Sequence, residues 1–271
     1  MIGQEALLKN IERLIAYGLP RFIIINGPKN SGKHLISKHI ARRIGATLVD
    51  SGIKVDEIRE TISLAYKQSE PTVYLLADAD KMSPAAKNAI LKVTEEPPRK
   101  AYFIMTLTDL NNTLATLRSR GAILTMDTYH PAELRDYAIE EREYDLNPGE
   151  RAILMNICAT PGDVDTLATY NITEFYQFVE TVADNIGKVN GANAFKIGSR
   201  LSYKEEDTGY DVTLFLRALQ YVYLCAANDT PHRSLLSIRE IGKYLAEMNT
   251  TGINKSATMD MLILELRRIW M

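Results

Sequence analysis

Gly27, Gly32 and Lys33 have the types and the spacing of a phosphate-binding loop. They form the pattern G-x4-G-K, and an apolar run precedes them while an amphipathic segment follows, which is the strand-to-helix context that the pattern requires. Glycines let backbone N–H groups curl around phosphate oxygens, and the Lys33 ammonium would reach the β- and γ-phosphates. The sequence therefore predicts a phosphate cradle. Its nucleotide-binding residues would be Gly27, Pro28, Lys29, Asn30, Ser31, Gly32, Lys33 and His34.

His34 departs from this pattern. A hydroxyl residue, Ser or Thr, would follow the lysine and hold a magnesium ion that bridges the β- and γ-phosphates. Imidazole is a poor ligand for this hard, oxygen-seeking ion. We expect His34 to be a neutral first-turn residue that faces solvent, and the cradle to hold ATP, ADP or only a phosphate or sulfate ion. No metal-binding residues are predicted.

The first 127 residues alternate short apolar runs with longer amphipathic segments. This alternation predicts a parallel sheet covered by helices on both faces. The expected strands are Phe22–Asn26, Thr47–Asp50, Thr72–Ala77, Ala101–Leu107 and Ala122–Met126, and the expected helices are Lys33–Ile44, Val55–Lys67, Pro84–Glu95 and Thr113–Arg118.

After Tyr129-His130-Pro131 the strand-like runs disappear, and helical patterning continues to the last residue. A small bundle is expected first, with helices at Pro131–Glu143, Pro148–Ala159 and Asp163–Tyr170. Longer helices follow, with interruptions at Asn190–Gly191, Asp207–Gly209, Asp229–Pro231 and Asn249–Gly252. The last helix carries an apolar stripe made of Met259, Leu262, Ile263, Leu266 and Ile269. Three domains are predicted, over residues 1–129, 130–172 and 173–271.

Composition limits the class of protein. The chain has 271 residues, 46% of them hydrophobic and 24% charged, and a net charge of -2, so a strongly basic nucleic-acid binder is excluded. Its two cysteines are far apart in the sequence and no CxxC pair occurs, which argues against a disulfide framework and against a cysteine zinc site. No apolar run is long enough to span a membrane. We expect a cytoplasmic protein.

The segment from Thr72 to Pro98 has a more specific pattern. It reads TVYLLADADKM, then NAILKVTEEPP, and it resembles the bacterial DNA polymerase III clamp-loader AAA+ subunits, whose pattern is Asp-Glu-Ala-Asp-Lys-Met followed by Glu-Glu-Pro-Pro. In this alignment the magnesium-binding Asp of the family falls on Ala77. The catalytic Glu falls on Asp78, one methylene shorter, and Asp80 is interpreted as a turn residue that ends a strand.

The resemblance implies two further functional positions. Thr108 follows the run FIMTL and corresponds to the polar sensor of the γ-phosphate. Arg120, in Ser119-Arg120-Gly121, corresponds to the arginine of the Ser-Arg-Cys motif, which reaches the ATP of a neighbouring subunit. Gly121 replaces the cysteine of that motif. Near Asp163 acidic residues stand where the family has a sensor arginine, and the zinc module of the family is missing before Thr47.

The departures at His34, Ala77, Asp78 and Asp163 alter the positions that the family uses to hydrolyse its own ATP. Arg120, which would act on the ATP of a neighbouring subunit, is kept. This asymmetry resembles the delta-prime subunit, and the gamma/tau subunits are the second choice. The resemblance implies an α/β P-loop AAA+ domain, a small helical lid and an all-helical collar-like domain. It also implies partners: other clamp-loader subunits bound through the C-terminal helices, and the sliding clamp and primer-template DNA through the assembly. The expected chain is a scaffold without ATPase activity of its own.

Two other functions stay open. The chain could be an active ATPase of the gamma/tau kind, with magnesium held by Asp78 or Asp80 and water. A P-loop kinase for a small molecule is the third, and the hundred C-terminal helical residues, which suit oligomer packing better than a substrate lid, argue against it.

Overall fold

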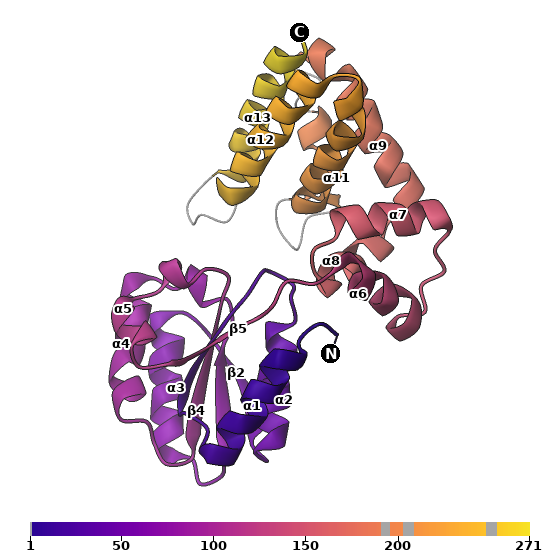
Figure 1. Cartoon of the computed structure of the whole chain (residues 1–271). Coiled ribbons are helices and arrows are strands. Elements are labelled where there is room, and N and C mark those ends of the chain that lie inside the picture. Colours follow the sequence, from indigo (N-terminus) through magenta and orange to yellow (C-terminus); the bar gives the residue numbers. More distant parts are fainter. Residues whose placement is uncertain (1, 191–195, 203–208, 248–253) are drawn as a thin grey trace. The chain divides into compact units, whose positions relative to one another are not determined.

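The computed structural model describes residues 2–190, 196–202, 209–247 and 254–271. The chain divides into two compact units, Met1–Tyr129 and His130–Met271 (Figure 1). The boundary falls at Tyr129, and the further division at residue 172 stays a prediction.

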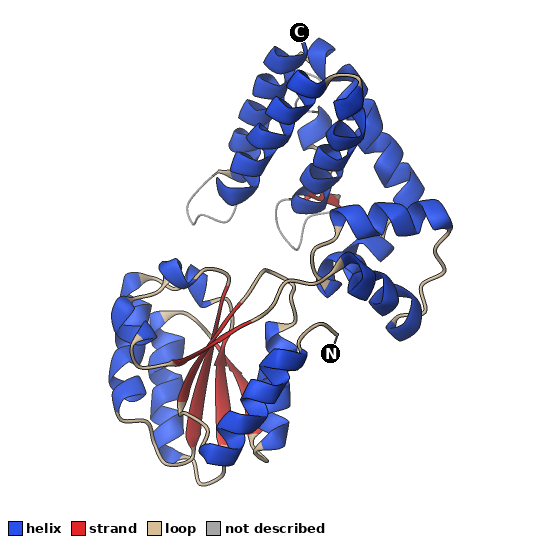
Figure 2. Ribbon diagram, in the orientation of Figure 1, coloured by secondary structure: helices blue, strands red, loops and turns tan. Residues whose placement is uncertain are grey.

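The first unit contains a five-stranded parallel sheet with the order β2-β3-β4-β1-β5. Helices flank this sheet on both sides (Figure 2). The strands are β1 (Phe22–Asn26), β2 (Thr47–Ser51), β3 (Thr72–Leu76), β4 (Ala101–Leu107) and β5 (Ala122–Thr125). The helices are α1 (Glu5–Tyr17), α2 (Lys33–Arg43), α3 (Val55–Lys67), α4 (Pro84–Glu95) and α5 (Ala115–Arg118), with short 3₁₀ turns at Ala79–Lys81 and Leu110–Asn112. Each predicted strand and helix of this unit is present, and the ends differ by at most two residues.

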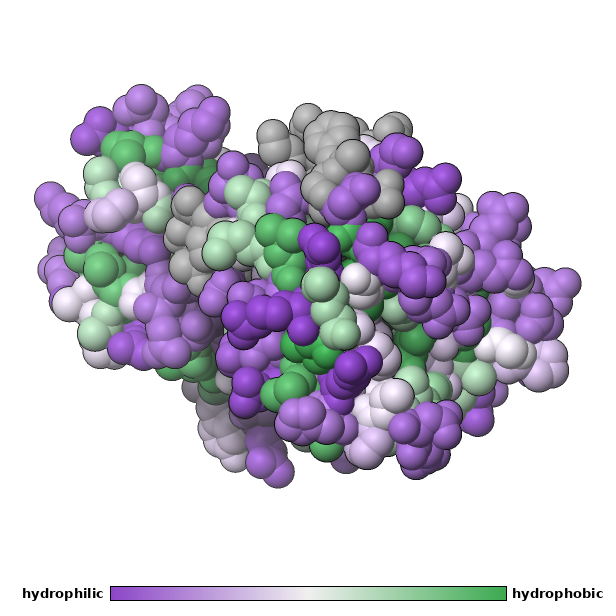
Figure 3. All heavy atoms as spheres, turned by 90° about the horizontal axis from the view of Figure 1, so that it is seen from above, coloured by the Kyte–Doolittle hydropathy of each residue, from purple (hydrophilic) through white to green (hydrophobic). Residues whose placement is uncertain are grey.

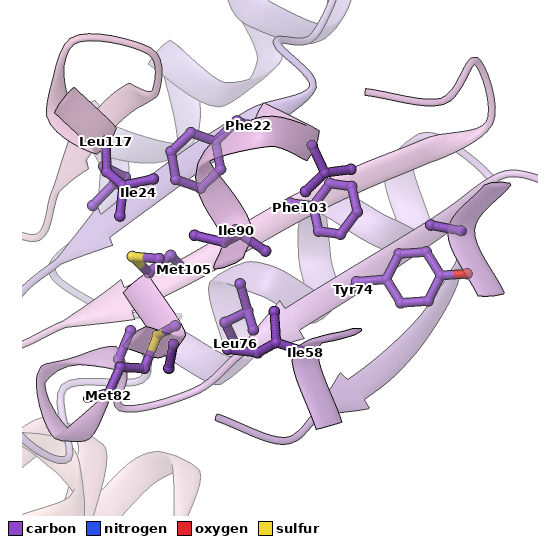
Figure 4. Packing of buried hydrophobic residues seen from close by; sticks show 14 of the residues in the cluster. Phe22, Ile24, Ile58, Tyr74, Leu76, Met82, Ile90, Phe103, Met105 and Leu117 are labelled. Carbon is purple, nitrogen blue, oxygen red and sulfur yellow. The ribbon is translucent and has the colours of Figure 1, made fainter. Parts of the chain in front are cut away.

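Two hydrophobic clusters cover the two faces of the sheet, because successive strand residues point to opposite faces. In β1, Phe22 and Ile24 belong to one cluster and Ile23 and Ile25 to the other. The first cluster also contains Phe103, whose ring stacks on Tyr74 with centroids 5.4 Å apart (Figure 4). This burial on both faces explains why the central strands β1, β3 and β4 are almost wholly apolar and show no clear alternation in the sequence.

The second unit is mainly helical. Its helices are α6 (Pro131–Asp136), α7 (Pro148–Ile157), α8 (Pro161–Ala168), α9 (Ile172–Asn185), α11 (Val212–Cys225), α12 (Pro231–Glu247) and α13 (Lys255–Trp270), with a π-helical turn at Tyr137–Glu141 and 3₁₀ turns at Ile186–Lys188 and Ala226–Asn228. Four of the five residues of the predicted C-terminal stripe are buried in α13: Met259, Leu262, Ile263 and Leu266.

One expectation for this unit was wrong. Strands do not disappear after His130, since β6 (Leu201–Ser202) and β7 (Tyr210–Asp211) form a parallel pair. Elements of two residues are too short to produce a periodic pattern. The helix expected over Pro131–Glu143 is present as far as Glu141, with π-helical geometry from Tyr137 onward, and the Tyr137–Glu141 turn packs against α8. Three of the predicted interruptions, at Asn190–Gly191, Asp207–Gly209 and Asn249–Gly252, lie wholly or partly outside the described residues.

The visible surface is mostly hydrophilic, with hydrophobic residues scattered among polar ones (Figure 3). Across the described ranges, no helix combines the length and the apolar composition needed to cross a lipid bilayer.

Candidate phosphate-binding loop and exposed arginine

The loop from Gly27 to Gly32 joins the end of β1 to the start of α2 at Lys33. Gly32 has φ +91°, a conformation that residues with a Cβ rarely adopt, and Asn30 also lies in the left-handed region, with φ +61°. A Cβ atom on Gly27 would stand 2.9 Å from the Cβ atom of Met126, so the loop passes too close to the end of β5 for a larger residue. The two motif glycines therefore serve the compact turn predicted from the sequence.

Lys33 turns back onto its own loop. Its Nζ atom donates hydrogen bonds to the carbonyl oxygens of Gly27 at 2.8 Å and Pro28 at 2.6 Å. Burial lowers the pKa of this ammonium, while the nearby charges of Asp78 and Asp80 act in the opposite direction. The two carbonyl oxygens use two of the three N–H donors of this ammonium group, so they would compete with an arriving phosphate for it.

The loop is also held by side chains around Ser31. The Ser31 hydroxyl donates to the Pro28 carbonyl oxygen at 2.8 Å and lies 3.2 Å from the Met126 sulfur. The hydroxyl of Tyr129, the last residue of this unit, donates to the Ser31 carbonyl oxygen at 2.7 Å. The role of Tyr129 was not expected from the sequence, because it lies 98 residues from its acceptor.

The two positions that would bind magnesium do not fit this ion. His34 is exposed, and its Nδ1 atom lies 3.8 Å from a carboxylate oxygen of Asp50. Ala77, at the end of β3, has only a methyl group. An imidazole and a methyl group provide none of the oxygen ligands that magnesium requires. Lys33 and the helix N-terminus favour an anion at the loop, and phosphate binding there stays a prediction.

The two aspartates after β3 have different surroundings. Asp78 has the left-handed φ of +51°, its backbone N–H donates to the Thr106 hydroxyl at 3.0 Å, and its carboxylate pairs with Lys81 at 2.9 Å. Asp80 accepts hydrogen bonds from the backbone N–H groups of Thr108 at 2.8 Å and Asp109 at 3.3 Å. Asp80 is thus more than the turn residue expected, because it fixes the loop that follows β4.

Thr108, the sensor-like position, is half-buried directly after β4, which lies between β1 and β3 in the sheet. The carboxyl ends of β1, β3 and β4 meet at one edge of this parallel sheet, so the loop, Asp78 and Thr108 share that edge. Its sensing role stays a prediction.

Arg120 follows α5, and its side chain is 31% exposed. Its Nη1 atom donates to the Thr116 carbonyl oxygen at 2.6 Å, and its Nη2 atom donates to a carboxylate oxygen of Glu95. The next residue, Gly121, is packed closely, since a Cβ atom there would lie 3.0 Å from side-chain atoms of Phe22 and Ile24. The small residue after the arginine therefore has a packing reason.

Asp163 and Asp165, the acidic residues of α8, accept hydrogen bonds from other residues of the second unit. Asp163 accepts hydrogen bonds from the Thr160 backbone N–H and from Arg217 of α11. Asp165 accepts hydrogen bonds from Arg142 and from the hydroxyls of Tyr137 and Tyr144, a network that sequence reasoning missed. Burial and the Asp165 carboxylate raise the pKa of Tyr137 to about 12.

The strand order, the loop between β1 and α2 and the helical second unit define a P-loop protein of the AAA+ class. Residues 45–130 match the family described as "DNA polymerase III, delta subunit". A DNA polymerase III subunit delta' from Yersinia pestis is 41% identical over 73 residues, which are 26% of this chain and 22% of that protein. A DNA polymerase III subunit gamma from Buchnera aphidicola is 28% identical over 152 residues, covering 44% of this chain and 42% of that protein. The chain is thus similar to clamp-loader AAA+ subunits of DNA polymerase III, both delta-prime-like and gamma-like.

Solved structures agree in fold. A DNA polymerase III gamma subunit-related protein from Thermotoga maritima has a TM-score of 0.50 at 17% identity, and the match covers 97% of this chain and 99% of that one. The Thermotoga maritima RuvB Holliday junction branch migration motor has a TM-score of 0.53 at 18% identity, covering 85% of this chain and 78% of that one. These matches confirm the predicted fold class. The sequence matches above span less than half the length of each relative.

Proposed function

We propose that this chain is a clamp-loader subunit of a DNA polymerase III assembly, similar to delta-prime, that does not hydrolyse ATP itself. One observation carries this proposal: His34 and Ala77 remove both protein ligands of magnesium, while Arg120 is retained on the surface. Losing the metal removes a large part of the stabilisation of charge in phosphoryl transfer. An arginine that acts on a neighbour needs no metal in its own chain.

The cradle would keep a lesser role in this proposal. The residues from Gly27 to Lys33 would hold the phosphates of ATP or ADP, or a phosphate or sulfate ion, without magnesium. The Lys33 hydrogen bonds to Gly27 and Pro28 would compete with the ligand, so we expect weak binding.

The partners proposed are other clamp-loader subunits, reached through the C-terminal helices, with the sliding clamp and primer-template DNA engaged by the whole assembly in the cytoplasm. Arg120 would lie against the ATP of one neighbour and neutralise charge on its γ-phosphoryl group. Its planar guanidinium suits this task, because it presents several donors in a fixed arrangement.

The test uses ATP turnover in two settings. The purified chain should show no magnesium-dependent ATPase activity. An assembly reconstituted with the motor subunits of the same organism should lose about 100-fold or more of its turnover when Arg120→Ala is introduced at the site that this subunit serves. Arg99→Ala, a change to another exposed arginine in the same unit, is the matched control and should have no effect. Robust turnover by the purified chain that Lys33→Met abolishes would refute the proposal.

One observation favours a second candidate, an active motor subunit of the gamma/tau kind. The pKa of Lys33 is lowered by burial, and the charges of Asp78 and Asp80 partly oppose this shift, so acidic groups do stand beside the cradle. In that case Asp78→Asn should stop hydrolysis by the purified chain. Unchanged activity in this variant would count against the candidate.

A further inference from the structure

Glu95 and Arg120 form an ion pair across two elements. Glu95 is the last residue of α4, and Arg120 lies just after α5, which packs against α4. Arg120 also donates to the Thr116 carbonyl oxygen. The arginine therefore has one backbone acceptor from its own turn and one carboxylate from a separate helix.

These two partners differ in how readily they can be replaced. The Thr116 carbonyl is part of the backbone of α5 and moves only with that helix. The Glu95 side chain is 50% exposed and accepts from one Arg120 nitrogen only, so it lacks the two parallel bonds of a bidentate pair. Exposed single ion pairs are weak and are screened by salt. Glu95 is thus the replaceable partner.

A carboxylate oxygen and a phosphoryl oxygen accept hydrogen bonds from a guanidinium in similar ways. The Glu95 oxygen accepts from Nη2, which leaves this nitrogen with one donor fewer for an incoming phosphoryl oxygen. A triphosphate has more charge and more acceptors than one carboxylate, so it can displace Glu95 while Thr116 keeps the arginine in place.

We propose that Glu95 is a positioning residue that holds Arg120 in the separate subunit and gives way to the phosphate of a neighbour's nucleotide. The second half rests on the proposed function of Arg120, whereas the first half concerns this chain alone. Glu95 would hold the Arg120 guanidinium until a neighbouring subunit with bound nucleotide arrives. The strength of this ion pair would then set how readily Arg120 leaves Glu95 for the phosphate.

The first test measures the accessibility of Arg120 in the full chain. Peptide mapping by mass spectrometry gives the rate at which 4-hydroxyphenylglyoxal modifies each arginine. Glu95→Gln should speed modification of Arg120 about two- to fivefold, the factor that corresponds to an exposed ion pair. The adjacent Glu96→Gln removes the same charge and leaves the pair intact, so it should match the unchanged protein. Salt at about 1 M should speed modification of Arg120 in the unchanged protein and not in Glu95→Gln. Equal rates in all three proteins would overturn the proposal.

The second test uses the reconstituted assembly. Glu95→Gln should lower the subunit concentration that gives half-maximal ATPase stimulation by the same two- to fivefold and leave the maximal rate unchanged. A fall in the maximal rate would overturn the exchange, because it would make Glu95 a lasting part of the site. If Arg120→Ala leaves turnover unchanged, the proposed function fails, while the modification result for the separate chain still decides whether Glu95 holds Arg120.

Discussion

The carboxylate of Asp163 accepts a hydrogen bond at 2.6 Å from the Nη1 atom of Arg217, which lies 54 residues later. The same oxygen also accepts from the backbone N–H groups of Ala159 and Thr160 at the start of α8. Asp163 is buried, so the guanidinium and these backbone N–H groups compensate for its lost hydration. An acidic residue at this position thus joins the N-terminus of α8 to α11 of the same unit.

Arg217→Met should destabilise the protein by about 2–3 kcal/mol, since it leaves a buried carboxylate with backbone partners only. The Met side chain keeps the apolar part of the arginine. Arg239→Met is the matched control, because Arg239 pairs with Glu240 at an exposed site, and it should cost less than about 1 kcal/mol. Urea denaturation of the three proteins gives the comparison, and equal stabilities would show that the buried pair adds nothing.

Asp80→Ala should lower the free energy of unfolding by about 1–3 kcal/mol, because it removes the acceptor of the Thr108 and Asp109 backbone N–H groups. Asp78→Asn should cost less than about 1 kcal/mol, since it removes only an exposed pair with Lys81. Asparagine is chosen at position 78 because it tolerates the left-handed backbone there. Thermal unfolding of both variants checks the order, and a larger loss for Asp78→Asn would contradict it.

Magnesium should change the affinity of this chain for ATP by less than about twofold, because His34 and Ala77 supply no oxygen ligand. Lys33→Met should weaken whatever binding exists by about tenfold or more, since the ammonium is the principal cation of the cradle. Calorimetric titration with ATP, with magnesium and with a chelator, measures both effects. Lys38→Met, an exposed lysine on the same helix, is the control. A strong magnesium dependence would instead favour a metal site formed by Asp78 or Asp80.

Asp165 should make the second unit sensitive to acid. Its burial raises the pKa, but the hydrogen bonds from Arg142, Tyr137 and Tyr144 outweigh burial, and the folded-state pKa lies below its usual value. A lowered folded pKa gives a stabilisation that is fully present above the unfolded pKa, about 3.9, and is lost as pH falls through the folded value.

Asp165→Asn should therefore lose stability at neutral pH and show a shallower decline below about pH 4 than the unchanged protein. Denaturation at several pH values measures this slope. Asp145→Asn, at an exposed position of the same unit, should leave the slope unchanged. Parallel slopes for Asp165→Asn and the unchanged protein would show that the network does not depend on the charge.

Sequence reasoning succeeded where the signal is local. The glycine spacing of the loop and the apolar runs of the strands follow from neighbouring residues, and both predicted the first unit well. The Glu95–Arg120 and Asp163–Arg217 contacts join residues that are 25 and 54 positions apart. No pattern in the neighbouring sequence indicates which residue is the partner. The resemblance to a known family supplied Arg120 and Thr108, while the Asp80 hydrogen bonds became visible only once β3 and β4 were placed side by side.

The hydrogen bond from Tyr129 to the Ser31 carbonyl has a mechanical consequence. The tyrosine is the final residue of the first unit, so the loop that would receive phosphate is tethered to the point where the chain departs from that unit. If the loop changes its conformation, either Tyr129 moves with it or the hydrogen bond between Tyr129 and Ser31 breaks. The conformation of the loop from Gly27 to Gly32 is therefore coupled to the last residue of the first unit through a single tyrosine hydroxyl.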